Sequence, residues 1–175
     1  MATLPFQAVP SGTDIAIDAN IFVYAFLHQS DDCRALLLRC ARQDVYGVAT
    51  LDTVSEATHR LMCAEAMNSG IISKETRNPA ASLRKRPDAV AGLRTYWIQT
   101  QAILSLNLSF LQITEDHVRT AQSLRASCGL LTRDSLLVAA MQESGLTSLA
   151  SNDSDFDRVP GLIRYRPSDV ASVQP

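Results

Sequence analysis

Hydrophobic residues follow two spacings along the chain: short continuous runs, and longer stretches with an apolar position every three or four residues. The runs are typical of strands buried in a parallel sheet, and the longer stretches of amphipathic helices. Strands are predicted at residues 14–18, 45–50, 108–113 and 147–150, with 162–166 as an edge strand. Helices are predicted directly after residue 18, from Asp31 to about residue 41, from Thr53 to Asn68, from Asp88 through Ile103, from Thr114 to Gly129 and from Thr132 to Gly145.

The order of these elements predicts the fold class. Strand and helix alternate, and in the second half two helices separate consecutive strands. This order favours an α/β fold, a three-layer α/β/α sandwich with a mainly parallel central sheet. In such sheets ligands bind beyond the carboxyl ends of the strands, near the point where strand order reverses. Residues that follow the predicted strands are therefore the first candidates for chemistry.

Composition narrows the class of protein. The 175 residues suffice for one self-sufficient core, and we expect a single domain over residues 1–175 with its core at 14–167. A hydrophobic share of 46% excludes a disordered chain. Apolar runs are too short to span a membrane and the first residues do not resemble a signal peptide, so we expect a cytoplasmic protein with no membrane partner. Four cysteines without a CxxC pair fit a reducing compartment, and Cys33 and Cys40 are expected in the core.

Acidic residues recur at strand ends and helix starts. Asp18 follows the first predicted strand, Glu56 and Asp134 lie in first helical turns, and Asp153, Asp155 and Asp157 follow the strand at 147–150. Structural explanations stand beside the functional one: Thr53 and Glu56 fit a capping box, Asp134 suits a helix dipole, and the aspartates after 150 suit a polar turn. The parallel fold would nevertheless bring several of these acids to one rim.

Asp18 has the strongest claim to a functional role. It lies within the apolar segment IAIDANIF, and no Lys or Arg occurs before residue 34. An unpaired buried carboxylate costs several kcal/mol, and gathered carboxylates repel unless they are protonated or share a cation. Hard divalent ions prefer oxygen ligands, so Mg²⁺ or Mn²⁺ is the expected cofactor. Carboxylate-held metal ions suit phosphoryl chemistry, which points to phosphodiester hydrolysis. With three histidines and no HExxH motif, a zinc site is not expected.

Residues 71–105 contain a basic stretch in a chain of net charge −2. Residues 71–88 hold two prolines and are predicted to form a loop or irregular arm, before the long helix from Asp88. Six basic side chains against two acidic ones give residues 74–94 a local charge of +4. The stretch could be a solvated loop, or an arm that contacts RNA phosphates beside the acidic rim. Trp97 is expected to pack in the core, although Tyr96 and Trp97 could also stack bases.

Four segments together resemble a known family. IAIDANIFVYAF, TVSEATHRL, GLLTRDSLLVAAM and ASNDSDFDRVPGLIRYRP are similar, in this order, to the signature segments of PIN-domain nucleases, particularly toxin ribonucleases of the VapC type. The resemblance spans residues 14–167 and implies cleavage of RNA by water with Mg²⁺ or Mn²⁺, leaving a 5′-phosphate and a 3′-hydroxyl.

The resemblance also assigns roles to residues. It implies catalytic and metal-binding roles for Asp18, Glu56, Asp134 and Asp153, and it aligns Asn20 with the small polar residue that follows the first acid. Asp155 is expected as a further metal ligand, while Asp157 is expected to face solvent. Arg133 either contacts phosphate or pairs with a neighbouring acid. The remaining candidates for substrate binding are the basic residues of the arm, namely Lys74, Arg77, Arg84, Lys85 and Arg86.

Two other functions stay open at this level. A haloacid-dehalogenase-type phosphatase also begins with a strand-end Asp, but it needs a second acid two residues later, where this chain has Asn20. A PIN-like domain that binds RNA or a partner without cleaving it would be marked by a missing acid, and none is missing. The toxin resemblance further implies a cognate antitoxin and a homodimer.

Overall fold

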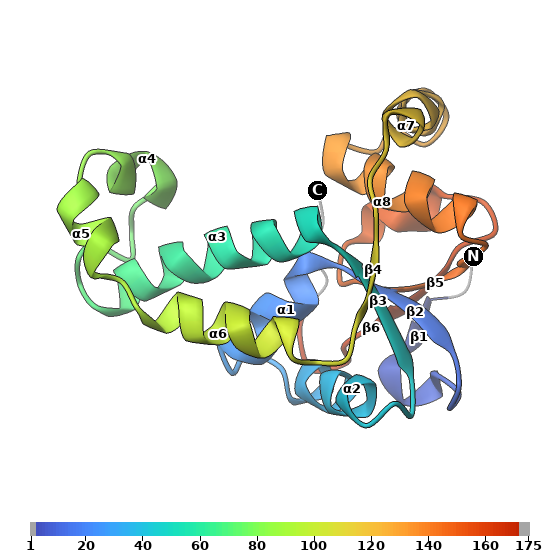
Figure 1. Ribbon diagram of the computed structural model, residues 1–175, viewed down its shortest axis with the longest axis horizontal. Helices are drawn as coiled ribbons and strands as arrows, with labels where there is room; N and C mark the ends of the chain where they lie inside the picture. Colours follow the sequence, from blue (N-terminus) through green and yellow to red (C-terminus); the bar gives the residue numbers. More distant parts are fainter. Residues whose placement is uncertain (1–2, 172–175) are drawn as a thin grey trace.

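In the described part of the chain, six parallel strands form a single sheet at the centre of the protein (Figure 1). The computed structural model describes residues 3–171. The strands lie in the order β1-β6-β5-β2-β3-β4. Their bounds are β1 Thr3–Pro5, β2 Asp14–Ile17, β3 Tyr46–Thr50, β4 Ser109–Leu111, β5 Ser148–Ala150 and β6 Ile163–Arg166. The chain leaves β2 toward β3 and β4 and later returns to β5 on the other side of β2. Strand order therefore reverses between β2 and β5.

Helices cover both faces of the sheet and confirm the predicted three-layer α/β/α fold. The helices are α1 Ala19–Phe26, α2 Asp31–Ala41, α3 Leu51–Asn68, α4 Pro79–Arg84, α5 Pro87–Gly92, α6 Thr95–Leu104, α7 Glu115–Cys128 and α8 Thr132–Glu143, with 3₁₀ turns at Phe6–Ala8 and Ser154–Arg158. One buried core lies between the sheet and α1, α2, α3 and α6, and a second lies between the sheet and α7 and α8. Within β2, Ile15 and Ile17 belong to the first core and Ala16 to the second, as the alternation of side chains along a strand requires.

The two ends of the sheet differ from the sequence-based prediction. Residues 162–166 were expected at an edge, but β6 lies between β1 and β5. The edge position belongs to β1, which pairs Thr3 with Arg164 and Pro5 with Arg166. A three-residue strand is too short to show an alternating pattern, and its partner lies about 160 residues away in the sequence. The prediction therefore had no local signal for β1.

The predicted starts of α1, α2 and α7 are confirmed, but the caps predicted for α3 and α8 are wrong. Thr114 caps α7 and Gly129, in the left-handed conformation, ends it, as expected. The predicted capping box of Thr53 and Glu56 is wrong, because the Thr50 hydroxyl accepts the Thr53 N–H at 3.0 Å and α3 begins at Leu51. Strand β3 thus passes into α3 without a loop, and Glu56 lies more than one turn inside the helix. Thr132 is likewise the first helical residue of α8 and not its cap.

The predicted long helix from Asp88 is two helices, α5 and α6. The break has a long-range cause: the Glu65 carboxylate of α3 accepts the backbone N–H groups of Arg94, Thr95 and Tyr96 at 2.8–3.0 Å and caps α6. Burial acts to raise the pKa of Glu65, but these three hydrogen bonds outweigh it and lower the pKa. Leu93 and Ile103 are buried as expected, whereas Trp97 and Ile98 are 50% and 65% exposed and do not pack in the core.

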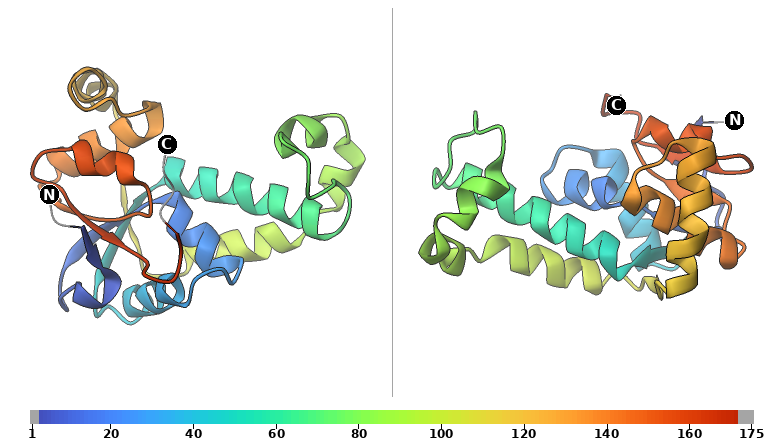
Figure 2. Two further views of the ribbon diagram at one scale, coloured as in Figure 1. Left: turned by 180° about the vertical axis from the view of Figure 1, so that it is seen from behind. Right: turned by 90° about the horizontal axis from the view of Figure 1, so that it is seen from above.

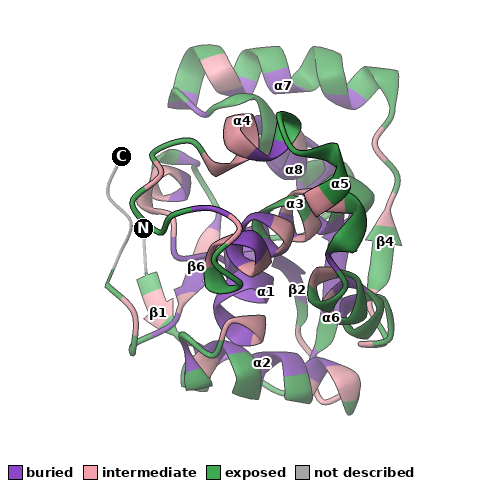
Figure 3. Ribbon diagram, turned by 90° about the vertical axis from the view of Figure 1, so that its left-hand side faces the viewer, coloured by how far each residue is buried: buried purple, intermediate pink, exposed green. Residues whose placement is uncertain are grey.

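Residues 71–94 are more ordered than the predicted loop. They form α4 and α5 at the end of α3 that is farthest from the sheet (Figure 2). Cys63, Ala66, Ile72, Leu83 and Leu93 are buried there as a small core of their own. We call α4, α5 and the segments that join them to α3 and α6 the arm. Figure 3 looks onto the arm and shows how much of α5 is exposed.

Two further predictions concern the cysteines and membranes. All four cysteines are buried and free, including Cys33 and Cys40. Burial raises the pKa of the Cys33 thiol to about 12 and that of Cys40 to about 11, so both stay uncharged in the core. Among residues 3–171 no helix is both long and apolar enough to cross a bilayer.

Candidate active site

Asp18 lies at the carboxyl end of β2, where it caps α1. One of its carboxylate oxygens accepts the Ala19 N–H at 2.6 Å. The other accepts the Asn20 amide at 2.5 Å and the Ser151 hydroxyl at 2.6 Å. Within the described residues Asp18 forms no ion pair with a basic side chain. The carboxylate is held by neutral donors, and its charge is not neutralised.

Ser151 and Asn152 complete this arrangement from the neighbouring strand, and sequence reasoning missed both. They follow β5, which pairs directly with β2. Ser151 accepts the Asp153 N–H at 3.0 Å, and the Asn152 N–H donates to the Asn20 side-chain oxygen at 3.3 Å. Both residues are fully buried, and the side-chain oxygen of Asn152 is a buried acceptor that has no partner among residues 3–171. The sequence signal that could have identified them is their position directly after β5, the strand that pairs with β2.

Three of the predicted acids line one small cavity of about 60 Å³. Asp18 comes from the end of β2, Glu56 from the second turn of α3 and Asp134 from the first turn of α8. We call this cavity the acidic pocket. Asp52 and Arg133 also line it. Segments more than 100 residues apart in the sequence therefore converge at the reversal point between β2 and β5.

Burial and neighbouring acids raise the pKa of Asp18 and of Asp134. Burial is the largest cause of the raised pKa of Asp18, and repulsion from Glu56 and Asp153 adds to it. Hydrogen bonds from Ser151 and Ala19 act to lower this pKa but do not outweigh burial, and the pKa rises to about 6. Burial also raises the pKa of Asp134, to about 7, with repulsion from Asp18, Asp153, Glu56 and Asp155. The site therefore concentrates negative charge that the described basic residues leave largely uncompensated.

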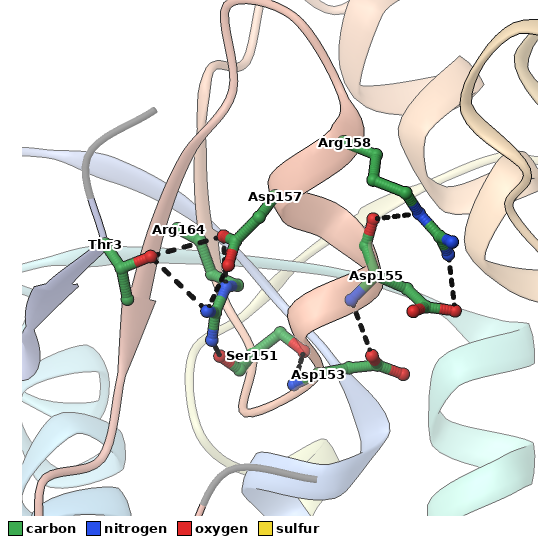
Figure 4. A network of polar contacts seen from close by, with 7 residues as sticks. All are labelled: Thr3, Ser151, Asp153, Asp155, Asp157, Arg158 and Arg164. Carbon is green, nitrogen blue, oxygen red and sulfur yellow. Dashed lines mark hydrogen bonds and ion pairs between the residues drawn. The ribbon is translucent and has the colours of Figure 1, made fainter. Parts of the chain in front are cut away.

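The aspartates after β5 have three different environments (Figure 4). Asp153 caps the 3₁₀ turn by accepting the Asp155 N–H at 2.8 Å, and it is close enough to raise the pKa of Asp18 and Asp134. Asp155 pairs with Arg158 at 2.7 Å. Asp157 was expected to face solvent but forms two hydrogen bonds, at 2.6 and 2.7 Å, with the buried guanidinium of Arg164. That contact lowers the pKa of Asp157, so this acid has a structural partner.

Arg133 and Asn20 are both engaged within the protein. Arg133, whose side chain is 63% exposed, pairs with Glu56 at 3.0 Å, the second of the two roles expected for it. Asn20 is buried; its amide nitrogen donates to Asp18 and Ser151, and its side-chain oxygen accepts the Asn152 N–H. In this structure Asn20 therefore positions the pocket, and its contact with substrate stays a prediction.

Comparison with known proteins decides the family. The sequence profile of the PIN domain matches residues 15–162, most of the chain. This chain belongs to the PIN domain family, a family of nucleases. Its fold is similar to that of VapBC2 from Rickettsia felis bound to a DNA fragment from its promoter, with 19% identity, a TM-score of 0.54 and coverage of 89% of this chain and 99% of the other. A toxin–antitoxin complex from Klebsiella pneumoniae gives 16% identity, a TM-score of 0.52 and coverage of 90% and 98%. A search of curated proteins gave no significant match.

The acidic pocket of this PIN domain fits a divalent metal ion by its chemistry. Its donors are carboxylate oxygens, which Mg²⁺ and Mn²⁺ prefer. The raised pKa values of Asp18 and Asp134 reflect burial first and repulsion between neighbouring acids second, and a bound cation would relieve that repulsion. The side chains are not gathered as a finished metal site: among residues 3–171 no three His, Cys, Asp or Glu groups are placed to hold an ion as they stand. Glu56 and Asp155 are turned to Arg133 and Arg158. Binding would require these acids to exchange an arginine for the ion.

The basic residues of the arm lie apart from the acidic pocket. The arm was expected to flank the acids, but none of its five candidate substrate residues lines the pocket. The arm lies at the far end of α3 because α3 extends beyond the sheet before α4 begins, and α6 runs back along α3 after α5 (Figure 1). Any substrate that contacts both sites has to lie along α3.

Proposed function

We propose that this PIN domain is a ribonuclease that uses Mg²⁺ or Mn²⁺ to hydrolyse RNA phosphodiester bonds, and that it acts in the cytoplasm as the toxin of a toxin–antitoxin pair. The observation that supports this most is the convergence of Asp18, Glu56 and Asp134 in one pocket, two of them with raised pKa values. Two of the three, Asp18 and Asp134, have no basic partner among the described residues, and structural sites seldom gather such acids because the repulsion costs stability.

The residues of the pocket divide into ligands and supports. Asp18, Glu56, Asp134 and Asp153 would hold the metal, with Asp155 as a further ligand once it leaves Arg158. A bound divalent ion would supply the positive charge that a phosphodiester and its attacking water require. Asn20 and Ser151 fix the Asp18 carboxylate in place, so that little reorganisation is needed there.

Arg133 has a role at the entrance of the pocket. Its guanidinium is exposed and holds Glu56 in the described structure. If Glu56 served as a metal ligand, Arg133 would be released and could pair with a phosphate of the RNA. The same side chain would thus neutralise Glu56 before the metal binds and contact the substrate afterwards.

The toxin role is supported by the family and by two structures of similar fold, a VapBC complex on promoter DNA and a toxin–antitoxin complex. We propose a small antitoxin that covers the acidic pocket, and a homodimer as the working state. Light scattering of the purified protein measures whether it is a homodimer. A monomer at micromolar concentration would contradict it without affecting the nuclease.

The decisive experiment is cleavage of total cellular RNA by purified protein with millimolar Mg²⁺ or Mn²⁺, with EDTA as the blank. We expect fragments with 5′-phosphate and 3′-hydroxyl ends, and loss of activity in Asp134→Asn. The matched control is Asp31→Asn, an exposed acid in the first turn of α2. Cleavage that survives EDTA would contradict the metal requirement. A folded protein that binds metal but leaves RNA intact would favour the non-catalytic alternative.

A further inference from the structure

A second cavity, of about 360 Å³, lies between α3 and the arm. Its floor is apolar, formed by Met62, Ala80, Leu83, Pro87 and Val90. Two side chains with flat polar groups, His59 and Arg84, complete the lining. We call this cavity the arm cleft. An apolar floor with a few polar groups is the usual composition of a site for a small planar molecule.

The arm cleft is held open by contacts of the arm with α3. Leu83 belongs to the small buried core that joins α4 to Cys63 and Ala66 of α3. The Arg86 guanidinium donates to the Ile71 carbonyl at 2.5 Å, which ties the start of α5 back to the segment after α3. Glu65 fixes the return into α6. The cleft is therefore preformed, and binding there costs little ordering of the chain.

The basic side chains of the arm fall into two groups. Arg86 and Arg94 donate to backbone carbonyls within the arm. The others make no hydrogen bond or ion pair with the part of the chain that the structure describes, and all are exposed; they are Lys74, Arg77, Arg84 and Lys85. Four uncommitted cations lie on the arm, and one of them, Arg84, lines the apolar cleft. In a chain of net charge −2 this local positive charge complements a polyanion that also carries flat apolar groups.

The arm cleft and the acidic pocket are connected along one face of α3. Glu56 lines the pocket and His59, three residues later, lines the cleft, and residues at this spacing share a helix face. The distance along the axis from Glu56 to Met62 is about 9 Å at the usual helical rise. Other faces of α3 are occupied: Val54, Ala57 and Leu61 are buried in the core with α1, and Thr58 bonds Thr100 of α6 at 3.0 Å. The open face leads from one cavity to the other.

We propose that the arm cleft binds one unpaired base of the RNA whose backbone is cleaved in the acidic pocket. The base stacks against His59 and the Arg84 guanidinium with its ring over the apolar floor, and Lys85 and Arg77 contact neighbouring phosphates. The arm thereby selects single-stranded RNA at a fixed distance from the cleaved bond. This proposal rests on the proposed ribonuclease function and names the part of the substrate that the arm recognises.

The test measures binding without cleavage, in EDTA and low salt, by fluorescence anisotropy. The probes are a labelled uridine 12-mer and a ribose-phosphate 12-mer of the same length without bases. Base stacking contributes about 1–3 kcal/mol, so we expect wild type to prefer the uridine strand by about tenfold. Ala80→Phe fills the cleft without changing charge, and it should reduce that preference to less than twofold while binding of the baseless strand is retained.

Surface variants give a second measurement that does not depend on the folding of Ala80→Phe. His59→Ala should lower affinity for the uridine strand alone, and Arg84→Ala should lower affinity for both strands, more for uridine. Arg42→Ala removes the same charge from the exposed end of α2 and serves as the matched control. Melting curves establish that each variant is folded.

The outcomes separate this proposal from the proposed function. If wild type binds both strands equally, or if Ala80→Phe and His59→Ala keep the full preference, the base site is overturned even when the protein cleaves RNA. Absence of binding to either strand overturns it as well. Tenfold preference with loss in both cleft variants supports the base site even if no cleavage of RNA is detected in the separate assay.

Discussion

Asp18 and Asp157 lie on either side of Ser151 and have opposite electrostatic surroundings. Ser151 donates its hydroxyl to Asp18, and its backbone carbonyl accepts the Arg164 guanidinium that also pairs with Asp157. Arg164 lowers the pKa of Asp157 through two hydrogen bonds, while burial and neighbouring acids raise the pKa of Asp18. The protein thus supplies a cation to one carboxylate and leaves the other without one. That difference separates an acid that holds the fold from an acid available to a ligand.

The largest expected effect is that of Asp18→Asn on RNA cleavage. Loss of a metal-holding carboxylate should reduce the rate by on the order of 10³-fold. The free energy of unfolding of the metal-free protein should stay the same or rise, because the change removes repulsion with Glu56 and Asp153. Asp14→Asn, at the other end of β2, is the matched control and should keep full activity. A strongly destabilised Asp18→Asn would instead make Asp18 structural.

Arg164→Met should have the opposite profile, with its main effect on stability. Removing one partner of a fully buried ion pair costs about 3–5 kcal/mol. Because the Asp157 side chain is 35% exposed, we expect the lower part of that range or less, roughly 4–10 °C in Tm for a protein of this size. The double variant Arg164→Met/Asp157→Ala should recover part of the loss, since it no longer leaves a carboxylate unpaired. A single variant as stable as wild type would show that Asp157 needs no cation, and the comparison with Asp18 would fail.

Millimolar Mn²⁺ should raise the Tm of wild type by several degrees. A ligand at 100 times its Kd adds about 2.7 kcal/mol to the native state. Asp18→Asn should show a much smaller rise, while Arg164→Met should keep the full rise from its lower starting Tm. Differential scanning calorimetry with and without Mn²⁺ measures both. Equal shifts in wild type and Asp18→Asn would place the ion elsewhere.

The pH dependence of the metal-free protein follows from the raised pKa values. Asp18 and Asp134 bind protons more tightly in the folded state, with pKa values of about 6 and about 7, than in the unfolded chain. Their contribution to stability is complete below about pH 4 and is lost as pH rises through 6 and 7. We expect Tm in EDTA to fall by a few degrees between pH 5 and 8, and less in Asp18→Asn. A Tm that rises over this range would contradict the assignment.

Arg133→Gln should have the smallest effect on stability, because exposed ion pairs contribute about 0–1 kcal/mol. Its effect on RNA affinity should exceed its effect on unfolding if Arg133 contacts phosphate. Arg119, which forms exposed pairs on α7, gives the control variant Arg119→Gln. Equal RNA binding by both variants would leave Arg133 with only its pairing to Glu56.

The sequence predicted what depends on local pattern and missed what depends on distant partners. Buried runs such as 15–17, and the Thr114 and Gly129 caps, were enough for the central strands and α7. Strand β1 depends on pairing with the strand that contains Arg164, and the break before α6 depends on Glu65; both partners are distant in the sequence. The true start of α3 depends on the nearby cap Thr50, which competes with Thr53. Trp97 shows the same limit, since helical spacing alone does not say whether another element covers that face.

For the candidate site, the acids were found from their places after strands, and the structure brings Asp18, Glu56 and Asp134 together. The neutral residues around them were not found, because Ser151 and Asn152 carry no charge that would stand out in a sequence. Asp157 was misjudged since its partner, Arg164, lies in a strand that was expected at an edge. The distance between the arm and the pocket likewise depends on how far α3 extends beyond the sheet.

Within residues 3–171 both outer strands of the sheet are three residues long, and β1 ends at Pro5, which has no N–H to donate. Such short margins give an incoming polypeptide few backbone groups with which to extend the sheet. A protein that captures this chain would therefore have to recognise side chains on its helices. The same feature should disfavour edge-to-edge aggregation of folded copies of the chain.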